Sequence, residues 1–273
     1  MVLLIGFPVG AKTERQIIGV EQDHSIAQVG DCDDFFKTVF TTFPASANEQ
    51  EKRDLAMTGI DKLQVTATQE GGVSVRGWSR PFARIMVCRS AVAQTKTHAR
   101  RVLDAINVPY REGNIWAYGP ANDQTQAWWV NFIVYVPRRA TVEIRAASGG
   151  VAIRNMDGNV TAHATTGGIS VAQGAGTFRI STESGGITLD RLSGSVDAAS
   201  REGAIALKIG GDDDVPMIEA RTETSGQIRC YLERCESGLG NWTADRKQLR
   251  IGGAPPSIRL STTGAAIIID AVR

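Results

Sequence analysis

The sequence Thr166-Gly-Gly-Ile-Ser-Val171 recurs 18 residues later as Ser184-Gly-Gly-Ile-Thr-Leu189. A related copy precedes this pair, at Ser148-Gly-Gly-Val-Ala-Ile153, and another follows it, at Glu202-Gly-Ala-Ile-Ala-Leu207. The first glycines of the four copies stand at positions 149, 167, 185 and 203, so the step is constant. Recurrence at a fixed spacing indicates stacked structural repeats, each too small to bury an apolar core alone.

A second short motif lies between these copies and gives each repeat a second strand. Its members are Val160-Thr-Ala162, Phe178-Arg-Ile180, Val196-Asp-Ala198, Ile218-Glu-Ala220 and Ile258-Arg-Leu260. A fifth copy of the glycine motif, Ser225-Gly-Gln-Ile-Arg-Cys230, follows the loop at 210–216, and a degenerate copy, Thr263-Gly-Ala-Ala-Ile-Ile268, closes the chain. An insertion at 231–256 interrupts the last repeat and is expected to form a protruding hairpin or loop.

Alternation within each copy predicts which side chains are buried. Successive side chains of a strand point to opposite faces, so we expect Ile169, Ile187 and Ile205 to stack as a buried ladder. The glycine pairs are expected to supply positive φ for tight turns. The predicted fold class is all-β: a β-solenoid of stacked strand repeats with about 18 residues per coil. An antiparallel β-sandwich is the competing arrangement, because its turn signals have a similar spacing.

The first half of the chain lacks this repeat and predicts a β-rich region with one amphipathic helix. Strands are expected over 61–67, 72–76, 114–118 and 127–136, and the helix over 91–107, where Ala99, Val102, Leu103 and Ile106 have helical spacing. The strand 127–136 is apolar on both faces and should be covered on both sides. The predicted organisation is a leader-like or poorly ordered N-terminus over 1–30, the β-rich region over 31–145 and the repeats over 146–273.

Composition narrows the function classes. The 273 residues include 30 Lys and Arg against 29 Asp and Glu, a net charge of +1, with 42% hydrophobic residues. Nucleic-acid binders carry a basic excess that is missing here, so no nucleic-acid partner is expected. No apolar stretch reaches the roughly 20 residues of a transmembrane helix. No cofactor is expected.

The apolar start and the cysteines both predict export. Residues 1–11 resemble the end of a signal peptide without its basic region, which predicts a mature N-terminus near Lys12; a short buried strand is the alternative. Four cysteines permit two disulfides in an exported chain, with three connectivities. We expect pairing within each half of the chain: Cys32 with Cys88, and Cys230 with Cys235. The predicted location is therefore extracytoplasmic: periplasmic, secreted or at the cell surface.

Residues suited to catalysis or metal binding do not form a known pattern. The three histidines, His24, His98 and His163, are interpreted as surface residues, and neither a Gly-x-Ser-x-Gly nor a His-Glu-x-x-His motif occurs. The outward row of the repeats, Arg154, Ser170, Thr188 and Ala206, is not a column of carboxylates. Asp212, Asp213 and Asp214 lack the spacing of a calcium loop and predict a solvated acidic segment. The chain is therefore interpreted as a non-enzyme without a metal site.

The irregular segments of the repeats are the expected place for recognition, because regular coils have similar faces. The loop at 210–216 and the insertion at 231–256 are expected in adjacent repeats. Their candidate interaction surface comprises Asp212, Asp213, Asp214, Trp242, Arg246 and Lys247. Trp242 is the first candidate for an exposed aromatic residue, but packing against the solenoid is its expected role. At least one of Trp128 and Trp129 should be buried. The alternative is that the insertion caps the open sheet edge.

The order of these motifs resembles a known family. A strand ending in Val136-Pro137, then Ala140-Thr-Val-Glu-Ile-Arg-Ala146, then the Gly-Gly copies, is similar to the bacterial putative-adhesin family, a β-strand-repeat domain of unknown function. The resemblance covers roughly residues 60 to 273. It implies a non-catalytic, cell-envelope-associated interaction or adhesion-like module with an envelope, glycan or protein partner. The alternatives are a carbohydrate-active enzyme on a β-solenoid scaffold and a sensory or structural domain of an envelope-stress system.

Overall fold

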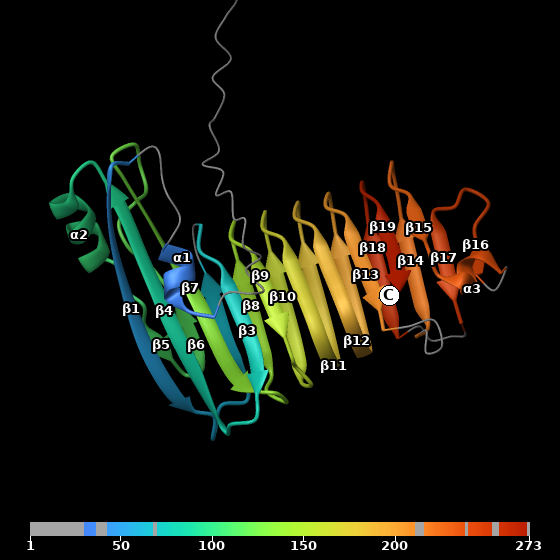
Figure 1. Cartoon of the computed structure of the whole chain (residues 1–273), viewed down its shortest axis with the longest axis horizontal. Helices are drawn as coiled ribbons and strands as arrows, with labels where there is room; N and C mark the ends of the chain where they lie inside the picture. The colour runs from blue at the N-terminus through green and yellow to red at the C-terminus, as the bar shows by residue number, and fades with distance from the viewer. Residues whose placement is uncertain are drawn as a thin grey trace, which may run out of the picture.

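The computed structural model describes residues 30–36, 43–67, 70–210, 216–237, 240–252 and 257–271. These residues form a predominantly β structure, as predicted, in which the strands lie side by side in a long curled sheet (Figure 1). The leader predicted over 1–30 lies outside the described residues except for Gly30, and so do His24, Asp212, Asp213 and Asp214.

The helices are α1 (Cys32–Phe36), α2 (Lys96–Asp104) and α3 (Glu233–Glu236). The strands of the first half are β1 (Ala45–Ala56), β2 (Leu63–Ala67), β3 (Val73–Trp78), β4 (Phe82–Ala93), β5 (Tyr110–Arg111), β6 (Asn114–Trp116), β7 (Gln126–Pro137) and β8 (Val142–Ala146). Those of the second half are β9 (Val151–Arg154), β10 (Asn159–Ala164), β11 (Ile169–Thr182), β12 (Ile187–Ser200), β13 (Ile205–Ile209), β14 (Ile218–Thr222), β15 (Ile228–Cys230), β16 (Gly240–Trp242), β17 (Gln248–Ile251), β18 (Ile258–Thr262) and β19 (Ile267–Ala271).

Two rows of parallel strands carry the repeats. In one row β8, β10 and the second half of β11 pair side by side, and in the other β3, β9 and the first half of β11 do so. The two long strands β11 and β12 pair along both halves and so join the rows into one sheet. The pairing register follows the sequence step, because Ile169 lies opposite Ile187, and Ile187 opposite Ile205.

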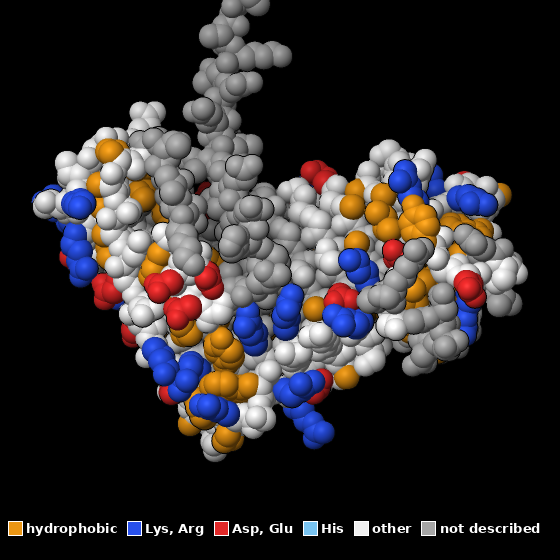
Figure 2. Space-filling view, viewed as in Figure 1, with side chains coloured by type: hydrophobic (Ala, Val, Ile, Leu, Met, Phe, Trp, Pro, Cys, Tyr) orange, Lys and Arg blue, Asp and Glu red, His pale blue; other side chains and the backbone are white. Residues whose placement is uncertain are grey.

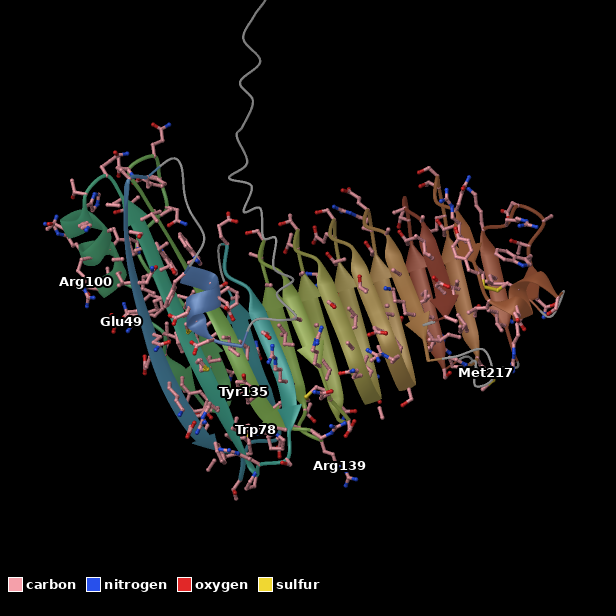
Figure 3. All side chains as sticks on the ribbon, in the orientation of Figure 1. Glu49, Trp78, Arg100, Tyr135, Arg139 and Met217 are labelled. Atoms are coloured by element: carbon pink, nitrogen blue, oxygen red, sulfur yellow. A yellow bond between two sulfur atoms is a disulfide. The ribbon has the colours of Figure 1, made fainter. Side chains whose placement is uncertain are left out.

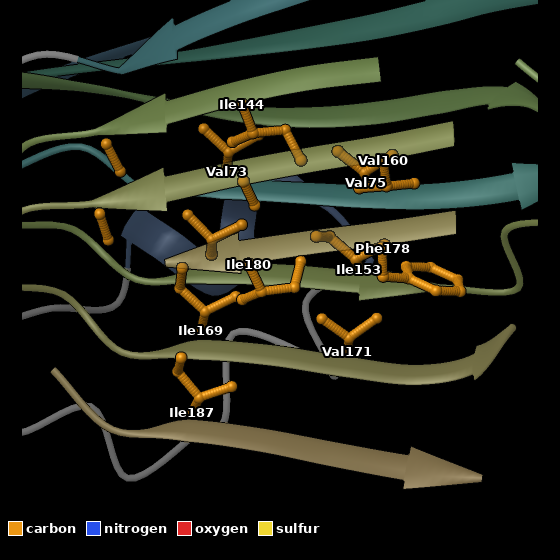
Figure 4. Packing of buried hydrophobic residues seen from close by; sticks show 14 of the residues in the cluster. Val73, Val75, Ile144, Ile153, Val160, Ile169, Val171, Phe178, Ile180 and Ile187 are labelled. Atoms are coloured by element: carbon orange, nitrogen blue, oxygen red, sulfur yellow. The ribbon is translucent and has the colours of Figure 1, made fainter. Parts of the chain in front are cut away.

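The predicted isoleucine ladder is confirmed. Ile169, Ile187 and Ile205 are 2%, 1% and 0% exposed and face the same interior. Side chains of the other row, such as Ile180 and Phe178, point into this interior from the opposite side (Figure 4). One continuous apolar core therefore runs from Leu63 to Ile269 and spans both halves of the chain.

The order of the last strands departs from the order along the chain. β18 lies between β12 and β14, and β19 lies between β13 and β15. The degenerate copy at 263–268 is thus inserted ahead of the fifth copy. The physical reason is packing: the buried Ile267 and Ile269 extend the ladder beyond Ile205 and Leu207, whereas the short β15 ends in a half-buried cysteine.

The glycine pairs do not supply positive φ, contrary to expectation. Positive φ instead recurs at Asn155, Gln173 and Arg191, which are 18 residues apart and turn the chain between the two rows. The first glycine of each pair instead allows close backbone approach. A Cβ at Gly185 would lie 2.1 Å from the carbonyl oxygen of Gly167, and one at Gly203 would lie 1.9 Å from that of Gly185.

Gly185→Ala should therefore destabilise the protein strongly, whereas its neighbour tolerates the same change. The added methyl group would meet backbone that is fixed by the ladder, so we expect a loss of about 3 kcal/mol in the free energy of unfolding. In the control Gly186→Ala, the Cβ would lie 3.4 Å from the Ala204 carbonyl oxygen, an ordinary contact. Urea unfolding of both variants measures the difference, and equal stabilities would contradict the role assigned to the first glycine.

In the first half, β7 is covered on both faces, as predicted. Phe132 points into the main core, whereas Ile133 packs outward against α1 and the Cys32–Cys88 disulfide. Both Trp128 and Trp129 are buried.

Two short helices, α1 and α3, were not predicted, and the expected helix over 91–107 is shorter because residues 91–93 continue β4. Helix α2 begins after Thr95, whose hydroxyl caps it by accepting a hydrogen bond from the His98 backbone N–H, at 3.2 Å.

Candidate functional site

The insertion folds back onto the sheet as a hairpin. β17 pairs antiparallel with β14 and β16 pairs antiparallel with β17, so the hairpin covers the outer edge of β14 (Figure 1). The Cys230–Cys235 disulfide joins the end of β15 to α3 at the base of this insertion. Covering an open strand edge prevents pairing with other chains, so the geometry suits a cap.

The predicted surface residues hold this hairpin in place. Trp242 is partly buried and packs against the core opposite Leu249, which agrees with the packing role expected for it. The Arg246 guanidinium lies 5.2 Å from the centre of the Trp242 ring, within the range of a cation–π contact. The Lys247 ammonium donates hydrogen bonds to the carbonyl oxygens of Glu223 and Thr224, at 2.6 and 2.5 Å.

A shallow hollow, here called the corner hollow, lies where four parallel strands end, with a volume of about 290 Å³. Its centre is open because the outward side chains of Ser181, Ala199 and Ser261 are short. Longer side chains border it, including Arg201, Arg221 and Glu223. These residues come from β11, β12, β18 and β14 or from the turns that follow them.

The floor of the corner hollow is a ladder of buried hydroxyl groups. The Ser200 hydroxyl donates to the Gly185 carbonyl oxygen, at 3.1 Å, and accepts from the Gly203 N–H, at 2.8 Å. The Thr182 hydroxyl makes the equivalent pair of bonds one repeat earlier: it donates to the Gly167 carbonyl oxygen and accepts from the Gly185 N–H. Each hydroxyl therefore satisfies buried backbone groups. Because these hydroxyl groups are already bonded, a ligand would meet the outward side chains of the centre and the border.

A second hollow, here called the tryptophan hollow, lies beside the hairpin and has a volume of about 190 Å³. Trp242, Asn241, Gln248 and Arg250 are among its lining residues. Arg221 lines this hollow as well as the corner hollow. The exposed Arg221 side chain therefore lies on the shared border of two adjacent depressions.

Two other arginines that line the hollows lie near carboxylates, whereas the side chain of Arg221 can interact with a ligand. Arg250 pairs with Glu219 at 2.7 Å, and Arg201 lies 3.7 Å from both Glu183 and Glu202. Within the described ranges, Arg221 makes neither an ion pair nor a hydrogen bond. Sequence reasoning missed it. The alternation of side chains along β14 predicts that Arg221 points outward. The residues that line the hollows with it are brought beside it by β17 and by the inserted β18, and this strand order is not evident from the sequence.

Several carboxyl groups have a lowered pKa because neighbouring groups stabilise the ionised form. The Lys62 ammonium and the Arg145 guanidinium bond Glu143 and keep the pKa of its carboxyl below the ordinary value. The Arg138 guanidinium lowers the pKa of the Asp157 carboxyl in the same way. Within the described ranges, every carboxyl with a shifted pKa is shifted downward: Glu51, Asp54, Asp123, Glu143, Asp157 and Asp245. A general acid for glycoside cleavage requires the opposite shift.

The two histidines that the structure describes, His98 and His163, are not among the residues that line either hollow. His98 Nε2 lies 3.0 Å from Gln126 Oε1, and His163 Nδ1 lies 3.0 Å from Ser181 Oγ. Across the part of the chain that the structure describes, no group of three His, Cys, Asp or Glu side chains has the arrangement of a metal site. No described helix is long and apolar enough to cross a membrane.

Comparison with known proteins gives likenesses among solved structures only, since no family model and no curated protein matches. A putative cell adhesion protein from Clostridium sporogenes is similar at 9% identity and a TM-score of 0.42, covering 83% of this chain and 100% of that chain. A putative adhesin from Bacteroides fragilis is similar at 10% identity and a TM-score of 0.36, covering 84% and 99%. A putative lipid binding protein from Parabacteroides distasonis is similar at 9% identity and a TM-score of 0.25, covering 84% and 99%. The chain resembles bacterial putative adhesins, which is also the resemblance that its sequence motifs indicate.

Proposed function

We propose that the chain is a non-catalytic, extracytoplasmic module of the bacterial cell envelope that binds acidic polysaccharide in an adhesion-like role. Its scaffold is a β-solenoid of about 18 residues per coil. The parallel pairing of Ile169 with Ile187 and of Ile187 with Ile205 supports that scaffold. The two disulfides support an oxidising compartment, because such bonds persist outside the cytoplasm.

The observation that carries this proposal is the position of Arg221. Its guanidinium is exposed between two hollows and offers hydrogen-bond donors in a planar fork that suits carboxylates. The hydroxyl groups of Ser181 and Ser261 and the amide groups of Asn241 and Gln248 line the same surface. Polar groups of this kind suit the hydroxyl-rich rings of a sugar polymer, and the arginine selects the acidic ones.

A binding role fits the surface chemistry better than glycoside cleavage. Cleavage needs one carboxylic acid with a raised pKa beside a second carboxylate. At the tryptophan hollow, the carboxylate of Glu219 is paired with Arg250 at 2.7 Å. On the same outer face of the sheet, Glu143 is held ionised by two cations. Glu219 and Glu143 therefore serve as ion-pair partners of cations, which favours a surface that binds a ligand without cleaving it.

Replacement of Arg221 tests this function. Polygalacturonate is the probe, and its dissociation constant for the full chain is measured by calorimetry. Loss of one charge-assisted hydrogen bond should raise that constant about tenfold or more in Arg221→Ala. In the control Arg111→Ala, which removes an exposed arginine of the N-terminal half, affinity should be unchanged. Equal affinity of wild type and Arg221→Ala, or cleavage of the polymer by the protein, would overturn the proposal.

A further inference from the structure

The turn between β3 and β4 carries a cluster of aromatic and basic side chains, here called the aromatic tip: Trp78, Arg80, Phe82, Arg84 and Tyr135. Trp78 is the last residue of β3 and Phe82 the first of β4, and β7 supplies Tyr135 beside them. Figure 3 shows Trp78 and Tyr135 as neighbours at the lower end of the molecule. The residues that line the two hollows come from other strands, β11, β12, β14 and β16 to β18, and from the turns beside them. Nothing in the proposed polysaccharide site involves these residues.

The rings of the aromatic tip are packed against one another. The centre of the Trp78 ring lies 4.9 Å from that of Phe82, edge to face, and 5.4 Å from that of Tyr135. The Trp78 indole N–H donates to the Phe82 carbonyl oxygen at 2.8 Å, so its polar atom is already satisfied. Trp78, Phe82 and Tyr135 are all partly exposed. A cluster of three large aromatic side chains is more often found in the core of a protein.

Two guanidinium groups lie over these rings. Arg80 is 5.1 Å and Arg84 5.6 Å from the centre of the Trp78 ring, which makes both cation–π contacts. Arg84 is neutralised by Asp54, at 2.7 Å, whereas Arg80 has no ion pair within the described residues. With guanidinium groups over it and Tyr135 beside it, the Trp78 ring has little free face on which a sugar could stack.

A further unpaired charge lies next to this cluster. Arg138 and Arg139 directly follow β7, and the Arg138 backbone N–H donates to the Trp78 carbonyl oxygen. Arg138 is neutralised by Asp157, at 2.7 Å, but Arg139 makes neither an ion pair nor a hydrogen bond in the described chain. Figure 2 shows hydrophobic side chains ringed by lysine and arginine at this end of the molecule. The surface is thus apolar at its centre and positively charged around it.

We infer that the aromatic tip docks on a bilayer surface that contains anionic phospholipids. Amphipathic aromatic rings favour the boundary between headgroups and acyl chains, and neighbouring cations attract anionic headgroups. The turn from β3 to β4 passes the end of β7, which pairs with both strands, and it lies at the lower edge of the sheet (Figure 1). A sheet edge of this kind can meet a planar surface more readily than it can enclose a polymer. Docking through the tip would leave the two hollows, at the other end of the sheet, free to bind polysaccharide.

Vesicle sedimentation tests the inference. We expect the full chain to bind vesicles of phosphatidylcholine mixed with phosphatidylglycerol and to bind vesicles of phosphatidylcholine alone much more weakly. Each arginine near an anionic surface contributes about a fivefold gain in partitioning, so Arg80→Ala with Arg139→Ala should lower binding about 25-fold. The matched control is Arg229→Ala with Arg259→Ala, which removes the same charge from exposed positions of β15 and β18 and should leave vesicle binding unchanged.

The outcomes separate this inference from the proposed function. Equal binding to both kinds of vesicle, or binding unaffected by the Arg80 and Arg139 changes, would overturn docking through the aromatic tip. Binding of polygalacturonate without any binding to vesicles would overturn the docking inference alone. Unchanged thermal unfolding of the double variant shows that a loss of binding does not come from misfolding. The conservative pair Arg80→Lys with Arg139→Lys should retain most of the binding, because the charge is kept.

Discussion

Ile187→Asp should leave the repeats unfolded under conditions in which the wild-type chain is folded. Ile187 is 1% exposed and lies in the middle of the ladder, paired with Ile169 on one side and Ile205 on the other. Loss of its apolar burial removes about 1.5–3 kcal/mol. A buried carboxylate without a cation adds several more. Together these losses approach the roughly 5–15 kcal/mol by which a typical protein is stable.

Two controls separate burial of charge from other effects. Thr188→Asp places the same carboxylate one residue further on, where the side chain is exposed, and should change stability little. Ile187→Val removes one methylene group and should lower the free energy of unfolding by only about 1 kcal/mol. Thermal unfolding followed by circular dichroism measures all three variants. A melting temperature for Ile187→Asp close to that of Thr188→Asp would contradict the buried ladder.

The ladder was readable from the sequence because two independent periods agree on it. Alternation places Ile169 and Val171 on the same face of one strand, and the constant step between repeats brings each residue beside its counterpart in the next repeat. Both signals are local in the sense that they depend only on spacing. The buried face of the repeats could therefore be predicted residue by residue, and so could the coverage of β7, whose continuous apolar run has no exposed face.

Interactions between distant segments could not be read in the same way. The glycine pairs were interpreted through backbone dihedrals, but their role comes from a carbonyl oxygen of the preceding repeat, as at Gly185 and Gly167. Positive φ instead falls on Asn155, Gln173 and Arg191, of which only asparagine is a residue type that favours that conformation. Arg221 was missed for a similar reason, since its importance depends on which strands lie beside β14.

Strand order is the feature with the largest consequence, because it decides what the C-terminal residues hold together. β14 pairs with β17 and β18, β15 with β19, and β16 with β17. Among the described strands, every pairing that joins the segment 216–252 to the rest of the sheet therefore passes through β18 or β19. The last strands of the chain are an internal layer, although they are the end of the sequence.

Deletion of residues 257–273 should accordingly release the whole segment 216–252 instead of trimming one edge. Without β18 and β19, the ladder ends at Ile205 and Leu207, and β12 and β13 present unpaired backbone groups. Limited proteolysis with mass spectrometry should show rapid cleavage throughout 216–252, while residues 45–182 stay protected because their pairings do not involve the deleted strands. The exposed edge should also make the variant self-associate in size-exclusion chromatography.

Deletion of residues 236–250 is the matched control, because it removes a segment of similar size from the hairpin outside β14. It takes away β16 and most of β17 but leaves β18 and β19 between their partners, so β14 and β15 should stay protected from proteolysis. If the strands were instead stacked in the order of the sequence, β18 and β19 would form the last coil. Deletion of 257–273 would then only shorten the sheet and would leave 216–252 protected. The cleavage pattern of the two variants therefore distinguishes the inserted order from the sequential one.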